Sequence, residues 1–255
     1  MKLHFTVLGS GTSQGVPVIG CGCKVCTSVD VLDKRLRTSL LVQSEHTTIC
    51  IDAGPDFRQQ MLNSGVKQLD AIVFTHEHMD HTAGLDDVRA FNYSQKKPML
   101  LYCTEQVEKR LREQYSYIFN NPNYPGIPQI QFVRLKNKAF SVGEIDINPI
   151  KALHAQLEVY GFRFKELTYL TDANKISQEE KEKIKGAAYF IVNALRREPH
   201  HSHFNLQEAI SLGHELEVEQ TFLTHISHQM GLHKEVEQEL PQGVNLAFDG
   251  LEISV

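Results

Sequence analysis

The residues that most clearly point to chemistry lie in AIVFTHEHMDH, residues 71–81, where an apolar run ends in three histidines and an aspartate. Burying His76, His78 and His81 together is costly unless something satisfies their ring nitrogens, and a divalent metal ion does so. His76 and His78 point to one side while the chain is extended. The turn that follows can bring Asp80 and His81 to a neighbouring point. Because one ion cannot use all four comfortably, the segment predicts two adjacent metal ions.

Three later residues stand in the same context, at or just after the end of an apolar run. They are His154 in INPIKALHA, Asp172 in LTYLTDAN and His225 in TFLTHISH. Each of them alone is compatible with an ordinary polar strand end. Together with the first cluster they complete a set of seven candidate metal ligands.

A second cluster, GCGCKVC, places Cys21, Cys23 and Cys26 on one glycine-bearing loop. This spacing lets three thiolates face one soft cation. The loop lacks a fourth ligand, and His228, three residues after the last candidate histidine, can supply it if the two imidazoles point apart. The alternative is a set of reduced loop cysteines without a metal, which need no partner inside a cell.

The elements that must position these residues are strands and helices in mixed order. Short apolar runs bounded by Gly, Asp and Asn predict strands in residues 3–9, 39–44, 47–54, 71–78, 99–103, 158–164, 167–174, 188–194, 220–228 and 245–253. Helical patterns predict helices in residues 82–91, 105–119, 177–186 and 204–217. This mixture favours an α/β layered fold, and because no stretch reads as a linker we expect a single domain over residues 1–255.

Two local signals add detail. Ser177 followed by Glu180 fits a capping box at the start of a helix. Residues 120–129, NNPNYPGIPQ, contain three prolines and a glycine, which exclude a helix or a central strand. We expect a loop there, and the wider segment of residues 115–130 is a candidate lid.

Composition limits the class of protein. With 255 residues, 41% of them hydrophobic, the chain can bury a sizeable core. A net charge of -5 and a pI near 6.2 give no broad basic surface for an extended nucleic acid, although a small anionic substrate is allowed. Five cysteines, three of them in one tight cluster, argue against a disulfide framework, and Cys50 and Cys103 are predicted core residues.

The sequence carries no signal-peptide pattern and no apolar run near the roughly 20 residues that span a bilayer. We therefore expect a cytoplasmic protein with no membrane partner.

The HEHMDH run, followed by single His, Asp and His candidates in that order, resembles the metallo-β-lactamase superfamily over nearly the whole chain. The resemblance implies a four-layer αββα sandwich with a binuclear metal site at one edge of its two sheets, and Asp172 as the bridge between the ions. It implies the following ligands: His76, His78 and His154 for one ion, and Asp80, His81 and His225 for the other. It also implies that Asp52 supports the site from behind, whereas the residue alone is equally compatible with a turn before Gly54.

The cysteine loop and the LTHISH segment resemble one branch of that superfamily, the cyclic phosphodiesterases of the carbon-phosphorus lyase pathway. The likeness extends to GTSQGVPV and FDGLEI, but residues 105–130 have no match that we can assign. It implies a structural zinc ion held by four residues: Cys21, Cys23, Cys26 and His228. It also suggests a homodimer.

A last cluster, EPHHSHFNLQEA, places His200, His201 and His203 before a helix that starts near Asn205. The same resemblance matches His203 with a histidine that contacts the scissile phosphate or protonates the leaving group. A charge switch near pH 7 suits that role. We assign no role to His200 and His201.

Two ions a few ångströms apart can bind a phosphodiester and hold a hydroxide at neutral pH. We therefore expect a metal-dependent phosphodiesterase acting on a small, or cyclic, phosphodiester, with Asp80 and His203 as catalytic residues. The ligand chemistry admits Zn, Mn or Fe.

Three alternatives stay open. A transfer-RNA 3′-processing endonuclease uses a similar metal set but typically carries a basic arm, which is not evident here. A thioester or β-lactam hydrolase is a second alternative. The third is a non-catalytic binding module with structural metals.

Overall fold

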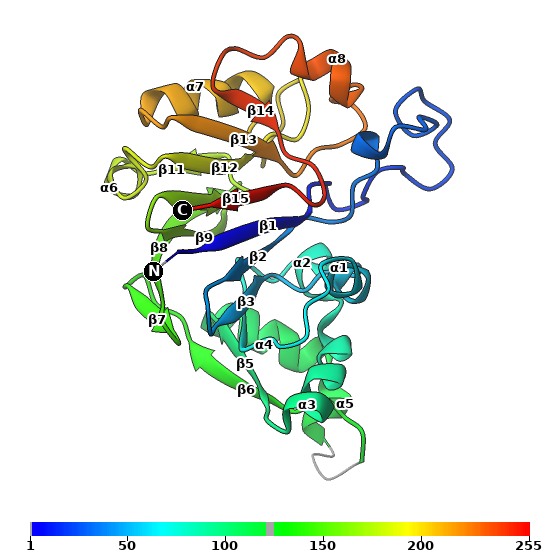
Figure 1. Ribbon diagram of the computed structural model, residues 1–255, viewed down its shortest axis with the longest axis vertical. Coiled ribbons are helices and arrows are strands. Elements are labelled where there is room, and N and C mark those ends of the chain that lie inside the picture. The colour runs from blue at the N-terminus through cyan, green and yellow to red at the C-terminus, as the bar shows by residue number, and fades with distance from the viewer. Residues whose placement is uncertain (1, 121–124) are drawn as a thin grey trace.

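The structure of the protein, a computed structural model, describes residues 2–120 and 125–255. Two β-sheets pack face to face, and helices cover the outer side of each sheet (Figure 1). Within the described residues, no helix has the length and apolar character needed to cross a membrane.

The first sheet has the strand order β15-β1-β2-β3-β4-β5-β6. Its strands are β1 (His4–Gly9), β2 (Ser39–Gln43), β3 (Thr48–Ile51), β4 (Ala71–Val73), β5 (Met99–Cys103), β6 (Ile130–Arg134) and β15 (Glu252–Ser254). Leu3 and Val255 exchange backbone hydrogen bonds of 2.7 and 2.9 Å beside the antiparallel pair of β1 and β15, so both ends of the chain lie together (Figure 1). From β3 to β6 the strands are parallel, so their carboxyl ends share one edge.

The second sheet has the order β11-β8-β9-β10-β12-β13-β14, with β7 paired to β8. Its strands are β7 (Phe140–Val142), β8 (Ile145–His154), β9 (Leu157–Phe164), β10 (Leu167–Leu170), β11 (Lys175–Ile176), β12 (Tyr189–Asn193), β13 (Gln220–Thr224) and β14 (Val244–Leu246). β10, β12 and β13 are parallel, and β8 runs the same way because β9 is antiparallel to both β8 and β10. The carboxyl ends of β8, β10 and β13 therefore lie at one edge.

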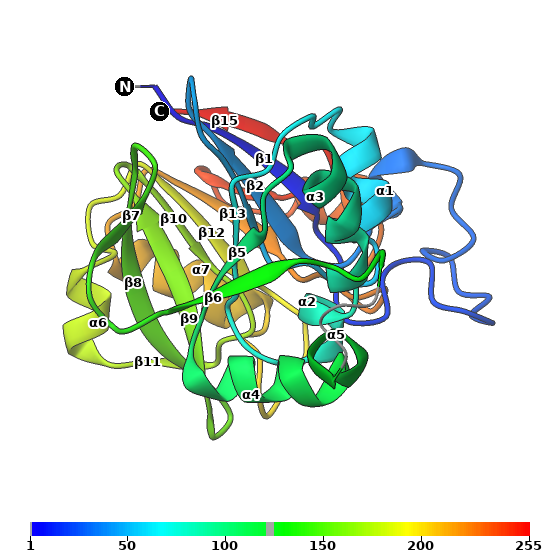
Figure 2. The ribbon, with the colours of Figure 1, turned by 90° about the horizontal axis from the view of Figure 1, so that it is seen from below.

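Helices close the two outer faces (Figures 1 and 2). The first sheet is covered by α1 (Phe57–Asn63), α2 (Met79–Thr82), α3 (Arg89–Gln95), α4 (Glu105–Gln114) and α5 (Ser116–Asn120). The second is covered by α6 (Gln178–Glu182), α7 (Leu206–Glu215) and α8 (His233–Glu237). Short 3-10 turns occupy Val31–Asp33 and Leu85–Val88.

The apolar core has three parts, which follow from these layers. Phe5 and Phe162 belong to a cluster between the sheets. Phe57 and Phe74 belong to a cluster under the helices of the first sheet, and Phe190 to one under α7 and α8. Fully buried apolar side chains stabilise the fold by roughly 1.5–3 kcal/mol each. The predicted four-layer αββα sandwich is confirmed.

The helix predicted over residues 105–119 is two helices, α4 and α5. The break lies at Tyr115, whose backbone leaves the helical region at φ -109° and ψ 39°. Its buried hydroxyl donates a hydrogen bond of 2.9 Å to the backbone oxygen of Thr82, so a tertiary contact fixes this residue. Residues 121–124 of the candidate lid lie outside the described residues.

The capping box predicted at Ser177 is only half formed. The Ser177 side chain accepts from the backbone N–H of Glu180, but the Glu180 carboxylate instead accepts from the Lys151 backbone and from Asn137. The reciprocal pair is found at Asn205 and Glu208, at the start of α7. The complete capping box, with both hydrogen bonds, therefore forms at the start of α7 and not at Ser177.

Candidate metal centre

The seven predicted ligands meet where the carboxyl ends of β4, β8, β10 and β13 come together. The ring centroids of His76 and His78 are 4.6 Å apart, and the ring of His154 lies 5.1 Å from that of His78. The rings of His81 and His225 stack at 5.9 Å. The histidines that follow β4 of the first sheet therefore lie close to His154 and His225, which lie at strand ends of the second sheet.

Asp172 lies at the centre of this arrangement. Its Oδ2 is 3.1 Å from His81 Nε2 and 3.2 Å from His225 Nδ1. Two groups of residues bring their ligand atoms within 4.8 Å of one another: Asp80, His81, Asp172 and His225, and also His154, Asp172 and His203. Because one carboxylate belongs to both groups, the geometry can hold two cations side by side. His76 and His78 lie beside the second group, close to His154.

Four buried ring nitrogens in this cluster make no hydrogen bond to any described residue. They are His76 Nε2, His81 Nε2, His203 Nδ1 and His225 Nδ1. A buried polar atom without a partner costs roughly 1–3 kcal/mol. Imidazole nitrogens beside carboxylates suit divalent transition-metal ions, so the residues present fit such ions.

Asp52 lies behind the cluster, as the sequence predicted. It is fully buried, and its Oδ2 is 2.7 Å from His81 Nδ1. The backbone N–H and the hydroxyl of Thr75 both donate to the Asp52 carboxylate at 2.8 Å. A carboxylate behind a histidine fixes which ring nitrogen carries the proton and leaves the other free for a metal.

Three further groups orient histidines from behind. Thr75 Oγ1 is 2.9 Å from His76 Nδ1. The backbone oxygen of Ser202 accepts from His154 Nδ1 at 2.7 Å. Thr12 Oγ1 lies 3.2 Å from Nε2 of His225, whose Nδ1 faces Asp172. Sequence reasoning missed these groups, because a hydroxyl or a backbone oxygen carries no spacing signal of its own.

The backbone adopts a left-handed conformation at three residues of the site. Asp52 has φ 65°, Asp172 has φ 54° and His225 has φ 55°. Each follows a strand of the sandwich within two residues, so the turn lifts its side chain out of the sheet. Residues other than glycine lose roughly 1–2 kcal/mol in this region, with Asp and His among the more tolerant. The strand ends are therefore strained where the ligands are presented.

Charge in the cluster is strongly coupled. Burial opposes ionisation of Asp172, but His225 and His81 outweigh it and hold the pKa of this carboxyl well below its usual range. Burial also opposes a charge on His81, yet Asp80, Asp172 and Asp52 raise the pKa of its imidazole well above its usual value. The carboxylates therefore favour a proton on His81 in the protein alone, and a cation bound there would compete with that proton.

His203 lies over the cluster. Its ring centroid is 4.5 Å from that of His154 and 4.9 Å from that of His225, and its Nδ1 is 3.7 Å from Asp172 Oδ1. Burial and the neighbouring His225 lower the pKa of His203 to about 3. The ring centroid of His200 lies 5.2 Å from that of His203 and 4.4 Å from that of His201. His203 is thus the histidine of the EPHHSHF cluster that reaches the metal-binding groups.

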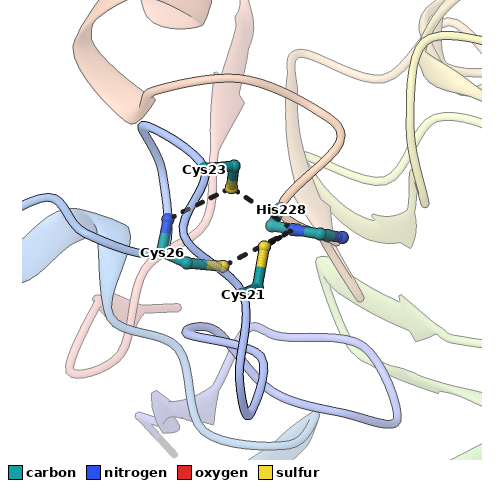
Figure 3. Close-up of side chains that lie close together, drawn as sticks. All are labelled: Cys21, Cys23, Cys26 and His228. Carbon is teal, nitrogen blue, oxygen red and sulfur yellow. Dashed lines mark hydrogen bonds between the residues drawn. The ribbon is translucent and has the colours of Figure 1, made fainter.

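The cysteine cluster lies apart from the histidines, where the loop between β1 and β2 meets the segment after β13 (Figure 3). The sulfur atoms of Cys21, Cys23 and Cys26 lie 3.3, 3.4 and 3.4 Å from His228 Nδ1. Tetrahedral zinc with ordinary bond lengths would separate these atoms by about 3.6 Å. All three cysteines are free, so the four residues have the spacing of a zinc site.

The cysteines differ in how readily they ionise. The Cys26 backbone N–H and then His228 lower the pKa of Cys23 to about 6. Burial raises the pKa of Cys26 to about 11. Because thiolates are the form that binds zinc, the half-exposed Cys23 is ready to bind and Cys26 would ionise on contact with the ion.

A family model described as the beta-lactamase superfamily domain matches residues 47–226, which include most of the histidine-rich centre. The chain belongs to this superfamily. It has the metallo-β-lactamase fold, and that fold implies divalent metal ions.

Solved structures of this superfamily agree with the fold. A diphosphatase from the PhnP family is 40% identical, with a TM-score of 0.94 over 100% of this chain and 98% of that one. Zinc-bound PqqB from Methylobacterium extorquens is 19% identical with a TM-score of 0.78, covering 98% of this chain and 99% of that chain. The short form of human tRNase Z is 17% identical with a TM-score of 0.71, covering 98% of both chains. The last two show the fold alone.

Two curated relatives are longer than the region they share with this chain. An octanoyltransferase from Porphyromonas gingivalis is 39% identical over 96% of this chain but only 50% of its own length. A coenzyme PQQ synthesis protein B from Methylorubrum extorquens is 29% identical over 40% of this chain and 37% of its own length. The chain therefore spans half or less of these relatives.

Proposed function

We propose that this protein is a metal-dependent phosphodiesterase that hydrolyses a small phosphodiester, cyclic esters included. The observation that carries the proposal is the set of four buried histidine nitrogens that make no hydrogen bond and lie around the shared carboxylate of Asp172. The 40% identical diphosphatase supports phosphoryl chemistry at this fold.

The residues that would hold the ions are the predicted ones, with Asp172 shared by both: His76, His78 and His154 for one ion, and Asp80, His81 and His225 for the other. Bound there, two Zn, Mn or Fe ions would bind the phosphate oxygens and lower the pKa of a water molecule so that hydroxide forms at neutral pH. A third ion, zinc, would be held at the cysteine cluster.

The chain's own residues would orient the reaction. Asp52, Thr75 and Thr12 hold the far side of three histidines, which fixes the direction of their free nitrogens. Asp80 lies 3.2 Å from His81 Nε2 at the more open side of the cluster and would accept a proton from the attacking water or bind a cation. We propose that His203, which lies against a ligand of each ion, gives a proton to the departing oxygen after an anionic phosphate at the ions has raised the pKa of its imidazole. In the protein alone burial and His225 lower that pKa to about 3, so the charge switch near pH 7 expected from the sequence requires the bound substrate.

The test is hydrolysis of bis(p-nitrophenyl) phosphate and a panel of cyclic phosphates before and after chelation, together with metal analysis. We expect about three metals per chain and chelator-sensitive turnover. In His203→Ala we expect turnover to fall by at least roughly 100-fold, with metal content unchanged. His214→Ala, an exposed histidine of α7, is the matched control. Bound metals with no hydrolysis of any phosphodiester would overturn the proposal, and lost metal in His203→Ala would make His203 a ligand instead.

A second candidate is hydrolysis of a diphosphate, favoured by the name of the 40% identical structure. Both reactions break a bond to phosphorus and use the same groups, so an organic diphosphate belongs in the same panel. An octanoyl thioester belongs there too, because of the half-length match to an octanoyltransferase. Transfer-RNA cleavage is the weaker proposal, since the net charge of -5 opposes a long polyanion. A cytoplasmic location and a homodimer stay predictions.

A further inference from the structure

The segments GTSQGVPV and FDGLEI, residues 11–18 and 248–253, have no part in the proposed reaction apart from Thr12. The first comes shortly after β1 and the second leads into β15, and these two strands lie side by side (Figure 1). Asp249 of the second segment bonds to Ser10, which directly precedes the first, although 239 positions separate the two residues in the chain. The two ends of the chain therefore meet in a polar contact behind the metal-binding edge.

Residues 10–12 run between two other stretches of backbone. On one side the N–H of Gly11 donates to the backbone oxygen of Leu36 at 2.8 Å. On the other side Ile226 donates to the first residue of the stretch at 2.9 Å and accepts from the last at 3.1 Å. A Cβ atom at Gly11 would lie 2.9 Å from the Cβ atom of Arg35, so only glycine fits here. The stretch thus connects the first sheet to the residue that follows a proposed metal ligand.

A chain of buried polar groups holds this stretch from behind. Arg35, which is 5% exposed, donates from Nη1 to Ser10 Oγ at 2.7 Å and to the backbone oxygen of Ala247 at 2.5 Å. The hydroxyl and the backbone N–H of Ser10 both donate to Asp249 Oδ1 at 2.8 Å. The other oxygen of Asp249 accepts from the Leu36 backbone at 2.7 Å. We call Ser10, Arg35 and Asp249 the brace.

Both ends of the brace are charged near neutral pH. Burial lowers the pKa of Arg35 to about 10, against the charges of Asp249 and Asp33, so the guanidinium stays cationic. Burial raises the pKa of Asp249 to about 6, so its carboxyl is mostly ionised at pH 7. Hydrogen bonds to charged groups are roughly twice as strong as those between neutral groups. The Ser10 hydroxyl, which accepts from one charge and donates to the other, is therefore held in one position.

The far end of the stretch reaches the metal centre. Thr12 Oγ1 lies 3.2 Å from Nε2 of His225, and both residues are buried. Because Nδ1 of His225 faces Asp172 at 3.2 Å, an ion at that side requires the ring proton to be on Nε2, where Thr12 accepts it. The place of Thr12 is set by the backbone of residues 10–12, and the brace fixes the first of these residues.

We propose that Ser10, Arg35 and Asp249 are positioning residues: they hold Thr12 against His225 and so raise the affinity for the one ion that His225 would bind. The inference rests on the proposed metal ligands and not on the reaction at phosphorus. It gives a role at the metal centre to both end segments of the chain.

The first experiment titrates Mn²⁺ into protein freed of metal, with calorimetry as the readout. Thiolates are poor ligands for Mn²⁺, so the titration reports on the histidine-rich centre. We expect Ser10→Ala to weaken one of the two affinities by roughly three- to tenfold. The other affinity should not change, because Thr75 and Ser202 orient the histidines of that group. Asp249→Asn, which can keep an acceptor toward only one of Ser10 and Leu36, should act in the same direction.

A double-mutant cycle separates positioning from a general loss of stability. If Ser10 acts through Thr12, Ser10→Ala should cause little further loss of affinity in a Thr12→Val background, whereas additive losses would refute the proposal. Ile253→Val is the matched control, because it shortens a buried side chain of β15 and costs stability without touching the brace. An equal loss of metal affinity in Ile253→Val would also refute the proposal.

A second readout follows the hydrogen bond itself. In the zinc-loaded protein, NMR detects the ring N–H of His225 that faces Thr12, and its exchange with water measures how well the bond is closed. We expect faster exchange in Ser10→Ala than in the unmodified protein, with Thr12→Val as the upper limit. Unchanged exchange in Ser10→Ala would show that the brace does not act on His225.

The outcomes distinguish this proposal from the proposed function. Selective loss of Mn²⁺ affinity in Ser10→Ala, in a protein that hydrolyses no phosphodiester, would support the brace and refute the phosphodiesterase. Hydrolysis of phosphodiesters with both affinities unchanged in Ser10→Ala would do the reverse. If the histidine-rich centre of the unmodified protein binds no ion, both proposals fail.

Discussion

The histidine-rich centre and the cysteine cluster are both groups of converging metal-binding side chains, yet the protein holds them in different ways. In the histidine-rich centre, Asp52, Thr75 and Thr12 fix the far ring nitrogens, and most ligands are buried. In the cysteine cluster, Cys21 and Cys23 are half-exposed on a loop. We therefore predict that the first site is organised before any ion arrives, whereas the second would depend on a bound ion for much of its order.

The loop that carries the cysteines is anchored by buried hydrogen bonds at its base, whereas its distal part is held by exposed ion pairs of Lys24 and Asp30 with α8. Asp249 accepts from the Ser10 backbone at 2.8 Å and from the Leu36 backbone at 2.7 Å, which joins the two ends of the loop. At the tip, Ile19 and Val29 are each 98% exposed. Loss of an ion from the cysteine cluster should therefore loosen the tip and leave the sheets intact.

The largest expected effect is that of Asp172→Asn, which keeps the size of the side chain but removes the charge shared by the two ligand groups. We expect turnover to fall by roughly 10³-fold or more, because both ions lose a ligand. Metal analysis should show fewer than two ions at the histidine-rich centre. Two retained ions with normal kcat would show that Asp172 does not bridge them.

Asp52→Asn should have the next largest effect. An amide N–H would face His81 Nδ1 in place of an accepting oxygen, which disturbs the tautomer that frees Nε2. We expect metal affinity to fall by roughly 10–100-fold, measured by titration of the metal-free protein. Asp146→Asn, at an exposed aspartate, is the control. Unaltered metal affinity would mean that the histidine-rich centre does not depend on the hydrogen bond from Asp52.

Thr12→Val removes a hydroxyl from the far side of His225 with little change of shape. We expect about a tenfold or smaller loss of affinity for the ion bound by His225, and Thr12→Ser should restore most of it. The measurement is again metal titration, with activity as a second readout. Equal behaviour of the valine and serine variants would assign the effect to packing and not to the hydrogen bond.

Cys23→Ser should have the smallest effect on activity and a clear effect on the loop. We expect the loss of one zinc per chain, faster proteolysis in residues 18–30 and a Tm lower by roughly 2–4 °C for each kcal/mol of stability lost. Val29→Ala, at an exposed residue of the same loop, is the control. If Cys23→Ser lost as much activity as Asp172→Asn, the histidine-rich centre would depend on the cysteine loop, and the two sites would not differ as proposed.

The candidate ligands, which the structure brings together, could be selected from the sequence because their signal is local. His76 and His78 alternate after a strand, and Asp172 and His225 each follow a strand that the apolar pattern reveals. His154 ends β8, which the sequence marked only as an apolar run. Thr12 and Ser202 gave no such signal. Thr12 reaches a residue 213 positions away, and Ser202 acts through its backbone oxygen, so both contacts exist only once the sheets have paired.

Errors in the predicted elements have the same origin. The division into α4 and α5 depends on Tyr115 reaching Thr82, which no periodicity encodes. β6 was not predicted because it is an edge strand with half-exposed side chains and no strict alternation. The local apolar pattern identifies which residue follows a strand. Long-range contacts decide where a helix ends and whether an edge strand joins the sheet.

The pairing of β1 with β15 has a consequence for engineering. Leu3 and Val255 bond to each other at the start of β1, while Thr12 reaches the metal centre beyond its other end. A short linker between residues 255 and 2 would therefore close the chain into a ring far from the ligands, and new ends could be opened in an exposed turn such as residues 136–139. Circular permutation offers a way to move the chain ends without disturbing the metal-binding edge.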